Sequence, residues 1–121
     1  MLSYDYDGSV LTLILRGTPS ELQRAITYNE IVRDDRVPEA SLVLIDIRRA
    51  DDADGPQEVE RRARILTQGL GPKLGAACAV IAPPRLAESA EQFQAMGRRL
   101  GVRIELFRDE PDARQWLATF R

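Results

Sequence analysis

Five charged residues at the end of a short apolar run are the best candidates for chemistry in this chain. The run "LVLIDI" spans residues 42–47, and the charged side chains at its end and just beyond it are Asp46, Arg48, Arg49, Asp51 and Asp52. Two neighbouring arginines near the start of a helix could clamp an anion through bidentate hydrogen bonds. They could equally pair with the aspartates beside them.

The residue types give little support to catalysis or metal binding. The chain has no histidine, which removes the commonest metal ligand and the commonest general base near neutral pH. Asp51, Asp52 and Asp54 could hold a divalent cation, but their spacing matches no calcium loop, so a solvated loop with a helix cap is favoured. A phosphate loop, a dinucleotide fingerprint and a nucleophile elbow are also missing. We expect no catalytic residue, no metal site, no cofactor and no enzymatic activity.

Length and charge narrow the class of protein further. The 121 residues fit a single domain, residues 1–121, and the net charge of −2 offers no general attraction to nucleic acid phosphates. The longest apolar run has about nine residues, against roughly 20 for a membrane span. The first residues include acids and form no signal peptide, so a cytoplasmic protein is expected. The single cysteine, Cys78, lies in an apolar run and is expected to be a buried small hydrophobe.

The first part of the chain predicts a hairpin followed by a helix. Asp7-Gly8 between alternating apolar residues indicates a turn that joins strands over residues 2–6 and 10–16. Thr18, Pro19 and Glu21 then match a capping box with proline at the first helical position. The helix should run to about Val32 with one apolar stripe, formed by Leu22, Ala25, Ile26, Tyr28, Ile31 and Val32.

The remainder predicts strands that alternate with helices. The continuous apolar run at 42–47 indicates a strand buried on both faces. A helix follows, capped by Asp54 and started by Pro56, with Val59, Ala63, Leu66 and Leu70 inward and with Arg61, Arg62 and Arg64 mostly toward solvent. Then come a buried strand at 76–82, a helix ending at Gly101, an edge strand at 102–107 and a closing helix with Trp116, Leu117 and Phe120. Right-handed crossovers give an α/β fold with a mixed, mostly parallel five-stranded sheet and four helices.

The whole chain resembles the SpoIIAA-like, STAS-type domains. The resemblance is carried by the opening "YDYDGSVLTLILRG", the helix start "TPSE", the central strand "LVLIDI", the later strand "AACAVIA" and the closing "EPDARQWL". The Ala-x-x-Trp-Leu pattern from Ala113 to Leu117 is similar to a common ending in that group. The resemblance implies a STAS-like fold over the full length.

The resemblance does not extend to the phosphorylation switch of STAS-type anti-sigma-factor antagonists. In those proteins the phosphorylated serine follows the central strand, which would place it just after Asp46. The sequence has no hydroxyl side chain from Leu42 to Leu66. Asp51 or Asp52 could supply a fixed negative charge, but a permanently charged residue is not a switch. The resemblance therefore implies the fold and a binding role without kinase control.

Two functions remain as expectations. The first is a non-catalytic protein-interaction or regulatory module that binds a partner through Asp46, Arg48, Arg49, Asp51 and Asp52. The alternative is a carrier or sensor of a small apolar, lipid-like ligand, because STAS-type folds resemble smaller relatives of the CRAL-TRIO lipid carriers. Small residues at 76–79 could leave room for a cavity, although close helix packing explains them equally well. Trp116 is expected either in the core or in an interface with a second copy of the chain.

Overall fold

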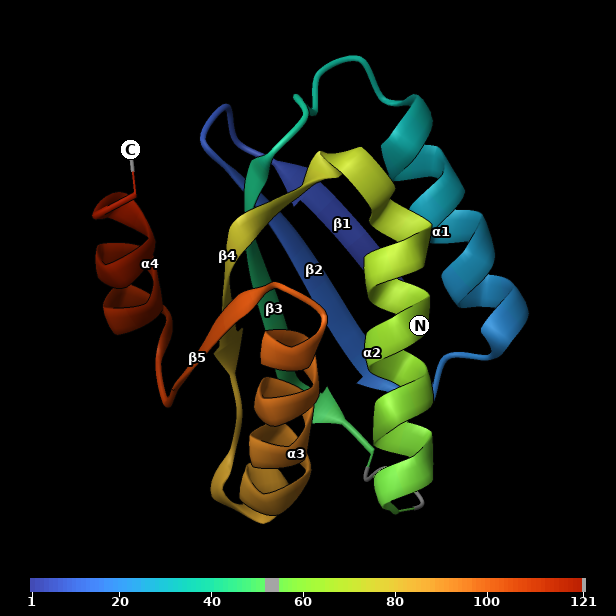
Figure 1. Cartoon of the computed structure of the whole chain (residues 1–121), viewed down its shortest axis with the longest axis vertical. Coiled ribbons are helices and arrows are strands. Elements are labelled where there is room, and N and C mark those ends of the chain that lie inside the picture. The colour runs from blue at the N-terminus through green and yellow to red at the C-terminus, as the bar shows by residue number, and fades with distance from the viewer. Residues whose placement is uncertain (52–54, 121) are drawn as a thin grey trace.

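The protein forms one five-stranded sheet with four α-helices (Figure 1). The computed structural model describes residues 1–51 and 55–120. Along the chain the elements are β1 (Leu2–Tyr6), β2 (Val10–Gly17), α1 (Glu21–Arg33), β3 (Ser41–Ala50), α2 (Pro56–Leu70), β4 (Leu74–Ile81), α3 (Ala87–Arg99), β5 (Arg103–Phe107) and α4 (Glu110–Ala118). Two short 3₁₀ turns, η1 (Gly71–Lys73) and η2 (Pro84–Leu86), precede β4 and α3. The predicted element order and the mixed α/β class are confirmed.

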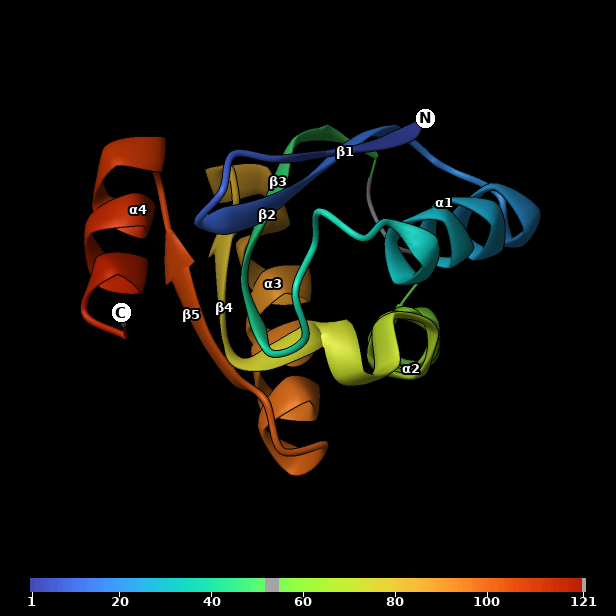
Figure 2. The same cartoon turned by 90° about the horizontal axis from the view of Figure 1, so that it is seen from above.

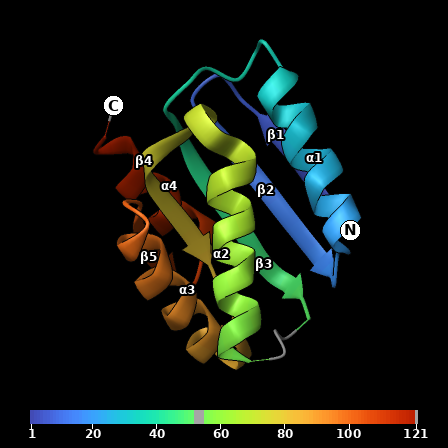
Figure 3. The same ribbon diagram turned by 45° about the vertical axis from the view of Figure 1, so that its right-hand side comes forward.

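The strands lie in the order in which they occur in the chain. β1 and β2 are antiparallel, whereas the pairs β2–β3, β3–β4 and β4–β5 are parallel. The three crossovers all step in the same direction across the sheet, and one handedness therefore places their helices on one face. Figures 2 and 3 show α1, α2 and α3 together on that face and α4 on the other.

Both faces of the sheet are buried, as the continuous apolar character of β3 predicts. Val43 and Ile45 belong to the core under α1, α2 and α3, whereas Leu44 belongs to the core under α4. All three side chains are at most 4% exposed. Alternate residues of a strand point to opposite faces, so an apolar residue at every position is what a strand covered on both sides requires.

Helix α4 docks on the sheet mainly through two fully buried residues. Ala113 and Leu117 are both 0% exposed. Trp116 is only half-buried and stacks at 5.7 Å from Phe107 and 4.8 Å from Phe120, ring centre to ring centre. Phe120 itself is 40% exposed, so the expectation that it docks inward is wrong.

The predicted cap of α1 is wrong by two residues. Ser20, and not Thr18, is the N-cap: its hydroxyl accepts a hydrogen bond from the Gln23 N–H at 3.1 Å, and the Gln23 side chain accepts one from the Ser20 N–H at 3.1 Å. Both pairs, Thr18 with Glu21 and Ser20 with Gln23, have the spacing of a capping box, so the spacing alone does not choose between them.

The predicted apolar stripe of α1 is also wrong in part. Tyr28 and Ile31 are buried, but Leu22, Ile26 and Val32 are 69%, 50% and 38% exposed. The helix is only weakly amphipathic, with apolar residues on both sides, and its sequence does not determine which side packs. Packing on the hairpin selects the side with Tyr28 and Ile31, and the helical period brings Arg24 and Thr27 to the same side.

Helix α2 is close to its prediction. It begins at Pro56 with Gly55 as the N-cap residue, and its buried face is Val59, Ala63, Leu66 and Leu70. The cap expected of Asp54 lies outside the described residues. Within the described part of the chain, none of the helices has the length and apolar composition of a membrane span.

Candidate functional site

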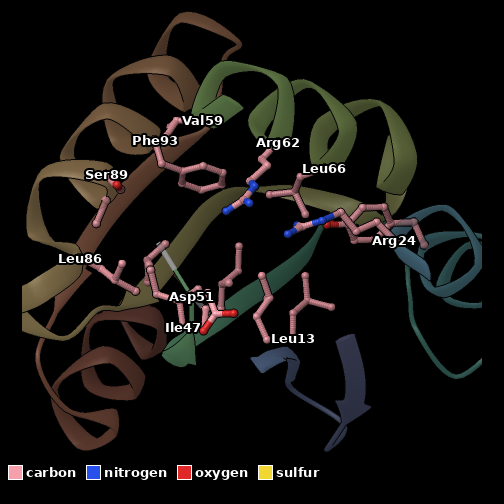
Figure 4. A pocket seen from close by; sticks show the side chains of 16 residues that line it. Leu13, Arg24, Ile47, Asp51, Val59, Arg62, Leu66, Leu86, Ser89 and Phe93 are labelled. Atoms are coloured by element: carbon pink, nitrogen blue, oxygen red, sulfur yellow. The ribbon is translucent and has the colours of Figure 1, made fainter. Parts of the chain in front are cut away.

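A cavity lies between the sheet and helices α1, α2 and α3 (Figure 4). Its volume is about 80 Å³, and it is open to the surface on one side. Most of its wall is apolar, with Leu13, Leu15, Ile45, Ile47, Ala50 and Val80 from the strands and Tyr28, Val59, Leu66, Leu86, Ala90 and Phe93 from the helices and η2. Because cavities in native cores rarely exceed the size of a water molecule, this one is a feature to be explained.

The size and walls of the cavity favour part of a small organic molecule. A water molecule occupies roughly 30 Å³ of the liquid, and an apolar cavity of about 150 Å³ is large enough for benzene. Buried water also needs about three polar partners, which most of this wall does not offer. A ligand would therefore place a short chain or part of a ring inside and extend its remainder through the open side.

Arg24, on the first turn of α1, is the most unusual residue of the wall. It is only 5% exposed, and its guanidinium points into the cavity in Figure 4. Its Nε donates a long hydrogen bond of 3.4 Å to the carbonyl oxygen of Pro19. No carboxylate of the described residues forms a salt bridge with it. A buried arginine normally has such a partner, so the position is electrostatically unsatisfied.

Arg62, on the second turn of α2, faces the same space. Its Nε donates to Glu58 Oε1 at 3.2 Å, and its side chain is 18% exposed. The expectation that Arg62 lies toward solvent with Arg61 and Arg64 is therefore wrong, while those two are exposed as expected. Positions 59, 62 and 66 follow one another around the buried side of α2, which explains why Arg62 turns inward.

The electrostatics show that Arg24, Arg62 and Tyr28 influence one another. Burial lowers the pKa of Arg24, and the positive charge of Arg62 adds to this shift, whereas the Tyr28 hydroxyl and the negative charge of Glu58 oppose it. Burial raises the pKa of Tyr28, and both arginines oppose that shift. The α1–α2 end of the cavity thus carries two positive charges and a hydroxyl, whereas the α3 end carries Leu86, Ala90 and Phe93.

Asp51 is the exposed member of the lining and links the two loops at the cavity. Its Oδ2 accepts a hydrogen bond from the Thr18 hydroxyl at 2.9 Å, and its N–H donates to the carbonyl oxygen of Gly17 at 2.9 Å. Arg85 fixes the preceding residue, because its Nη2 donates to the Ala50 carbonyl oxygen at 2.6 Å. The carboxyl ends of β2 and β3 are therefore held together beside the cavity.

The structure does not gather the five predicted partner-binding residues into one cluster. Asp46 and Arg48 form an ion pair at 2.8 Å, and Arg48 also lies 4.0 Å from Glu110 of α4, so this pair belongs to the α4 face. Asp51 lines the cavity on the opposite face, and Arg49 is exposed. Asp52 lies outside the described residues.

The sequence left two alternatives for the arginine pair, an anion clamp or pairing with the neighbouring aspartates, and Arg48 pairs with an aspartate. Its Nε and Nη2 donate to the two carboxylate oxygens of Asp46 at 3.0 and 2.8 Å. Burial acts to raise the pKa of Asp46, but the hydrogen bonds and charge of Arg48 outweigh it, and the pKa is lowered. This fork is therefore already occupied.

The small residues of β4 do not create the cavity. Ala77 and Ala79 pack in the core under α4, Cys78 is 1% exposed in the core under α1–α3, and Ala76 is exposed. Only Val80 of this strand lines the cavity. Close helix packing is therefore the role of Ala77 and Ala79, and the expectation of a buried Cys78 is confirmed.

Sequence reasoning missed Arg24, although a signal for it exists. Arg24, Thr27, Tyr28 and Ile31 recur at helical spacing, which is the pattern of one buried face with an arginine in it. An arginine on a helix is ordinarily assigned to solvent, so the predicted apolar stripe of α1 leaves Arg24 out.

Comparisons with protein-family models, curated proteins and solved structures returned no match. Within the described residues, no group of three or more histidine, cysteine, aspartate or glutamate side chains could hold a metal ion. The geometry of the cavity and of the helix surfaces is thus the basis for a functional proposal.

Proposed function

We propose that this protein is a non-catalytic domain that binds a small, mostly apolar ligand in the cavity between its sheet and helices α1, α2 and α3. The observation that carries the proposal is the cavity itself, about 80 Å³ of space with apolar walls and one open side. A ligand that displaces water from this open space and covers its apolar walls gains about 25 cal/mol for each Å² of apolar surface removed from water.

The proposal includes a regulatory use of the ligand in a cytoplasmic, STAS-like domain. The order of elements and the opening hairpin support the STAS-like identity, and the absence of a hydroxyl between Leu42 and Leu66 favours a signal other than phosphorylation there. Asp51 and Thr18 join the rim of the cavity to the loop that starts α1. Occupancy of the cavity can thereby be sensed at the helix surface.

A decisive test is ligand-observed NMR with neutral probes such as hexanol and indole, combined with a variant that fills the cavity. Ala90 is 2% exposed and lines the cavity, so Ala90→Leu should abolish binding of both probes. Ala95 lies on the same helix and is exposed, so Ala95→Leu is the matched control and should bind as the parent does. If neither probe contacts the parent protein, or if Ala90→Leu binds equally well, the proposal is wrong.

A second candidate function, protein interaction, is favoured by the outer face of α1. Leu22, Ile26 and Val32 expose 69%, 50% and 38% of their surface on one helix. Such a group of large apolar side chains is suited to an interface with a partner protein or with a second copy of the chain. The charged surface with Asp46, Arg48 and Arg49 is the other candidate contact region.

The interaction function is tested separately from ligand binding. Replacing Leu22 and Ile26 together by Asn should leave probe binding in the cavity unchanged, because neither residue lines it. The same double variant should lose any self-association seen by sedimentation, or any stoichiometric complex recovered from the source cell. Complexes that survive in the double variant would show that α1 is not the contact surface.

A further inference from the structure

We infer that the ligand of the cavity is an anion with an apolar body, a short-chain or small aromatic monocarboxylate, whose carboxylate is held by Arg24 and Arg62. The inference rests on the proposed function and adds to it the charge and polarity of the ligand. It begins from an arginine that is buried without a salt bridge to a carboxylate of the described residues.

Arg24 has no direct salt bridge of the kind that a buried arginine usually has, and the charge of Glu58 acts on it only from beyond contact. Its guanidinium is always protonated, and at 5% exposure it has lost most of its hydration. Pro19 offers Nε one long hydrogen bond, the Tyr28 hydroxyl interacts with the guanidinium, and the guanidinium points into the cavity without a carboxylate against it. A carboxylate in the cavity would accept two parallel hydrogen bonds from such a fork.

Arg62 strengthens the same end of the cavity. Glu58 accepts a hydrogen bond from its Nε, and within the described part of the chain no hydrogen bond occupies its terminal nitrogens. The positive charges of Arg62 and Arg24 repel each other, and an anion between them would relieve that repulsion.

The nearby carboxylates do not satisfy Arg24. Glu58 pairs with Arg62, and Asp51 accepts the Thr18 hydroxyl; neither forms a salt bridge with Arg24. The helix starts act in the same direction, because Arg24 and Ser89, whose hydroxyl also belongs to the cavity lining, come from the first turns of α1 and α3. Those turns carry the positive ends of the helix dipoles.

The rest of the cavity selects the class of anion. The α3 end is formed by Leu86, Ala90 and Phe93 together with Ser89, and this mostly apolar surface favours an apolar body over a free inorganic anion. An enclosed volume of about 80 Å³ leaves little space beyond a carboxylate and a few carbon atoms, so the chain or ring is short or extends through the open side. A monocarboxylate also forms the bidentate pair without a second negative charge to bury.

The test compares hexanoate with hexanamide, which have the same chain and differ in the charge of the head group. Titration calorimetry or ligand-observed NMR on the intact chain should show hexanoate binding about tenfold to a hundredfold more tightly, as expected for charge-assisted hydrogen bonds. Arg24→Gln should remove this preference while leaving hexanamide binding within about twofold of the parent. Arg62→Gln should reduce the preference. Arg64→Gln is the matched control, because Arg64 is exposed and pairs with Glu60 at 3.1 Å.

The ratio of the two affinities separates ligand recognition from a structural role. A purely structural Arg24 would change both affinities together, and the ratio would stay at its parent value in Arg24→Gln. If that variant does not fold, the parent ratio and Arg62→Gln still decide. Equal affinities of the parent for hexanoate and hexanamide would overturn the inference and leave the proposed cavity function intact. No binding of either compound at millimolar concentration would overturn both.

Discussion

Filling the cavity from helix α3 should stabilise the protein, which is the opposite of the usual result of enlarging a core residue. Ala90→Leu adds three carbon atoms at a wall position that is 2% exposed. The result depends on whether the space beside Ala90 is empty, as the structure indicates, or is taken up by neighbouring side chains.

The expected gain can be worked out from the cavity. Three buried carbon atoms contribute at most about 2.4 kcal/mol. Ordering the new leucine costs roughly 0.5–1 kcal/mol. We therefore expect Ala90→Leu to raise the free energy of unfolding by about 1 kcal/mol, within the range of cavity-filling substitutions.

Gly97→Ala, on the same helix, supplies the contrast. A Cβ on Gly97 would lie 2.0 Å from Cδ1 and 2.9 Å from Cγ1 of Ile104, which is itself 2% exposed. Alanine improves the helix by about 1 kcal/mol, but overpacking costs roughly 1–3 kcal/mol. Although it adds only one carbon atom, this change should lower the free energy of unfolding by up to about 2 kcal/mol.

Urea denaturation of the parent, Ala90→Leu and Gly97→Ala measures both effects. The midpoints should move in opposite directions while the slopes stay equal, which identifies a change in stability. If Ala90→Leu loses more than about 1 kcal/mol, the wall at α3 is already closely packed and the cavity reasoning is refuted.

Two further predictions concern Cys78 and helix α4. Burial raises the pKa of Cys78 to about 12, above its ordinary value of 9.0, so its contribution to stability is fully present below about pH 9 and is lost as the pH rises toward 12. At about pH 10 the parent should have lost on the order of 1 kcal/mol relative to Cys78→Ala, and denaturant melts near pH 8 and pH 10 check this; parallel loss in both proteins would contradict it. Leu117→Ala should cost about 2–5 kcal/mol because Leu117 is 0% exposed, and half-buried Trp116→Ala should cost less. Melts at two protein concentrations also test an interface at Trp116, because a loss that depends on concentration would indicate association.

The elements of the fold could be predicted because their signals are local. Asp7-Gly8 predicts the turn between the first two strands. In the structure, Asp7 Oδ1 accepts hydrogen bonds from the Ser9 and Val10 N–H groups at 2.9 and 2.8 Å. Pro56 starts α2, and its four predicted inward residues are its buried residues. Turn chemistry and periodicity need no knowledge of the rest of the chain.

The predictions are wrong where packing between segments far apart in the sequence decides which residues are buried. The hairpin determines which side of α1 is buried, and the helix has apolar residues on both sides. Thr18 does not cap α1, because its hydroxyl donates a hydrogen bond to Asp51, which is 33 residues further along the chain. Arg62 turns inward because its position follows the buried face of α2, whatever its own charge.

The predicted partner-binding residues and the cavity lie at the same end of the sheet but involve mostly different side chains. In parallel α/β sheets, ligands bind beyond the carboxyl ends of the strands, and "LVLIDI" directs attention to the end of β3. That end carries Asp46 and Arg48, which satisfy each other on the α4 face. The neighbouring end of β2 leads through Pro19 to Arg24, which is buried on the other face without a salt bridge.

The distinction between satisfied and unsatisfied charge is what makes the cavity the stronger site. Arg48 would have to give up its fork on Asp46 to bind an anion, and that exchange yields little net energy at an exposed position. Arg24 has no carboxylate to give up among the described residues, and its hydration is already lost when the protein folds. An incoming carboxylate is therefore the only group desolvated when the pair forms. For that reason the same bidentate interaction should favour binding at Arg24 far more than at Arg48.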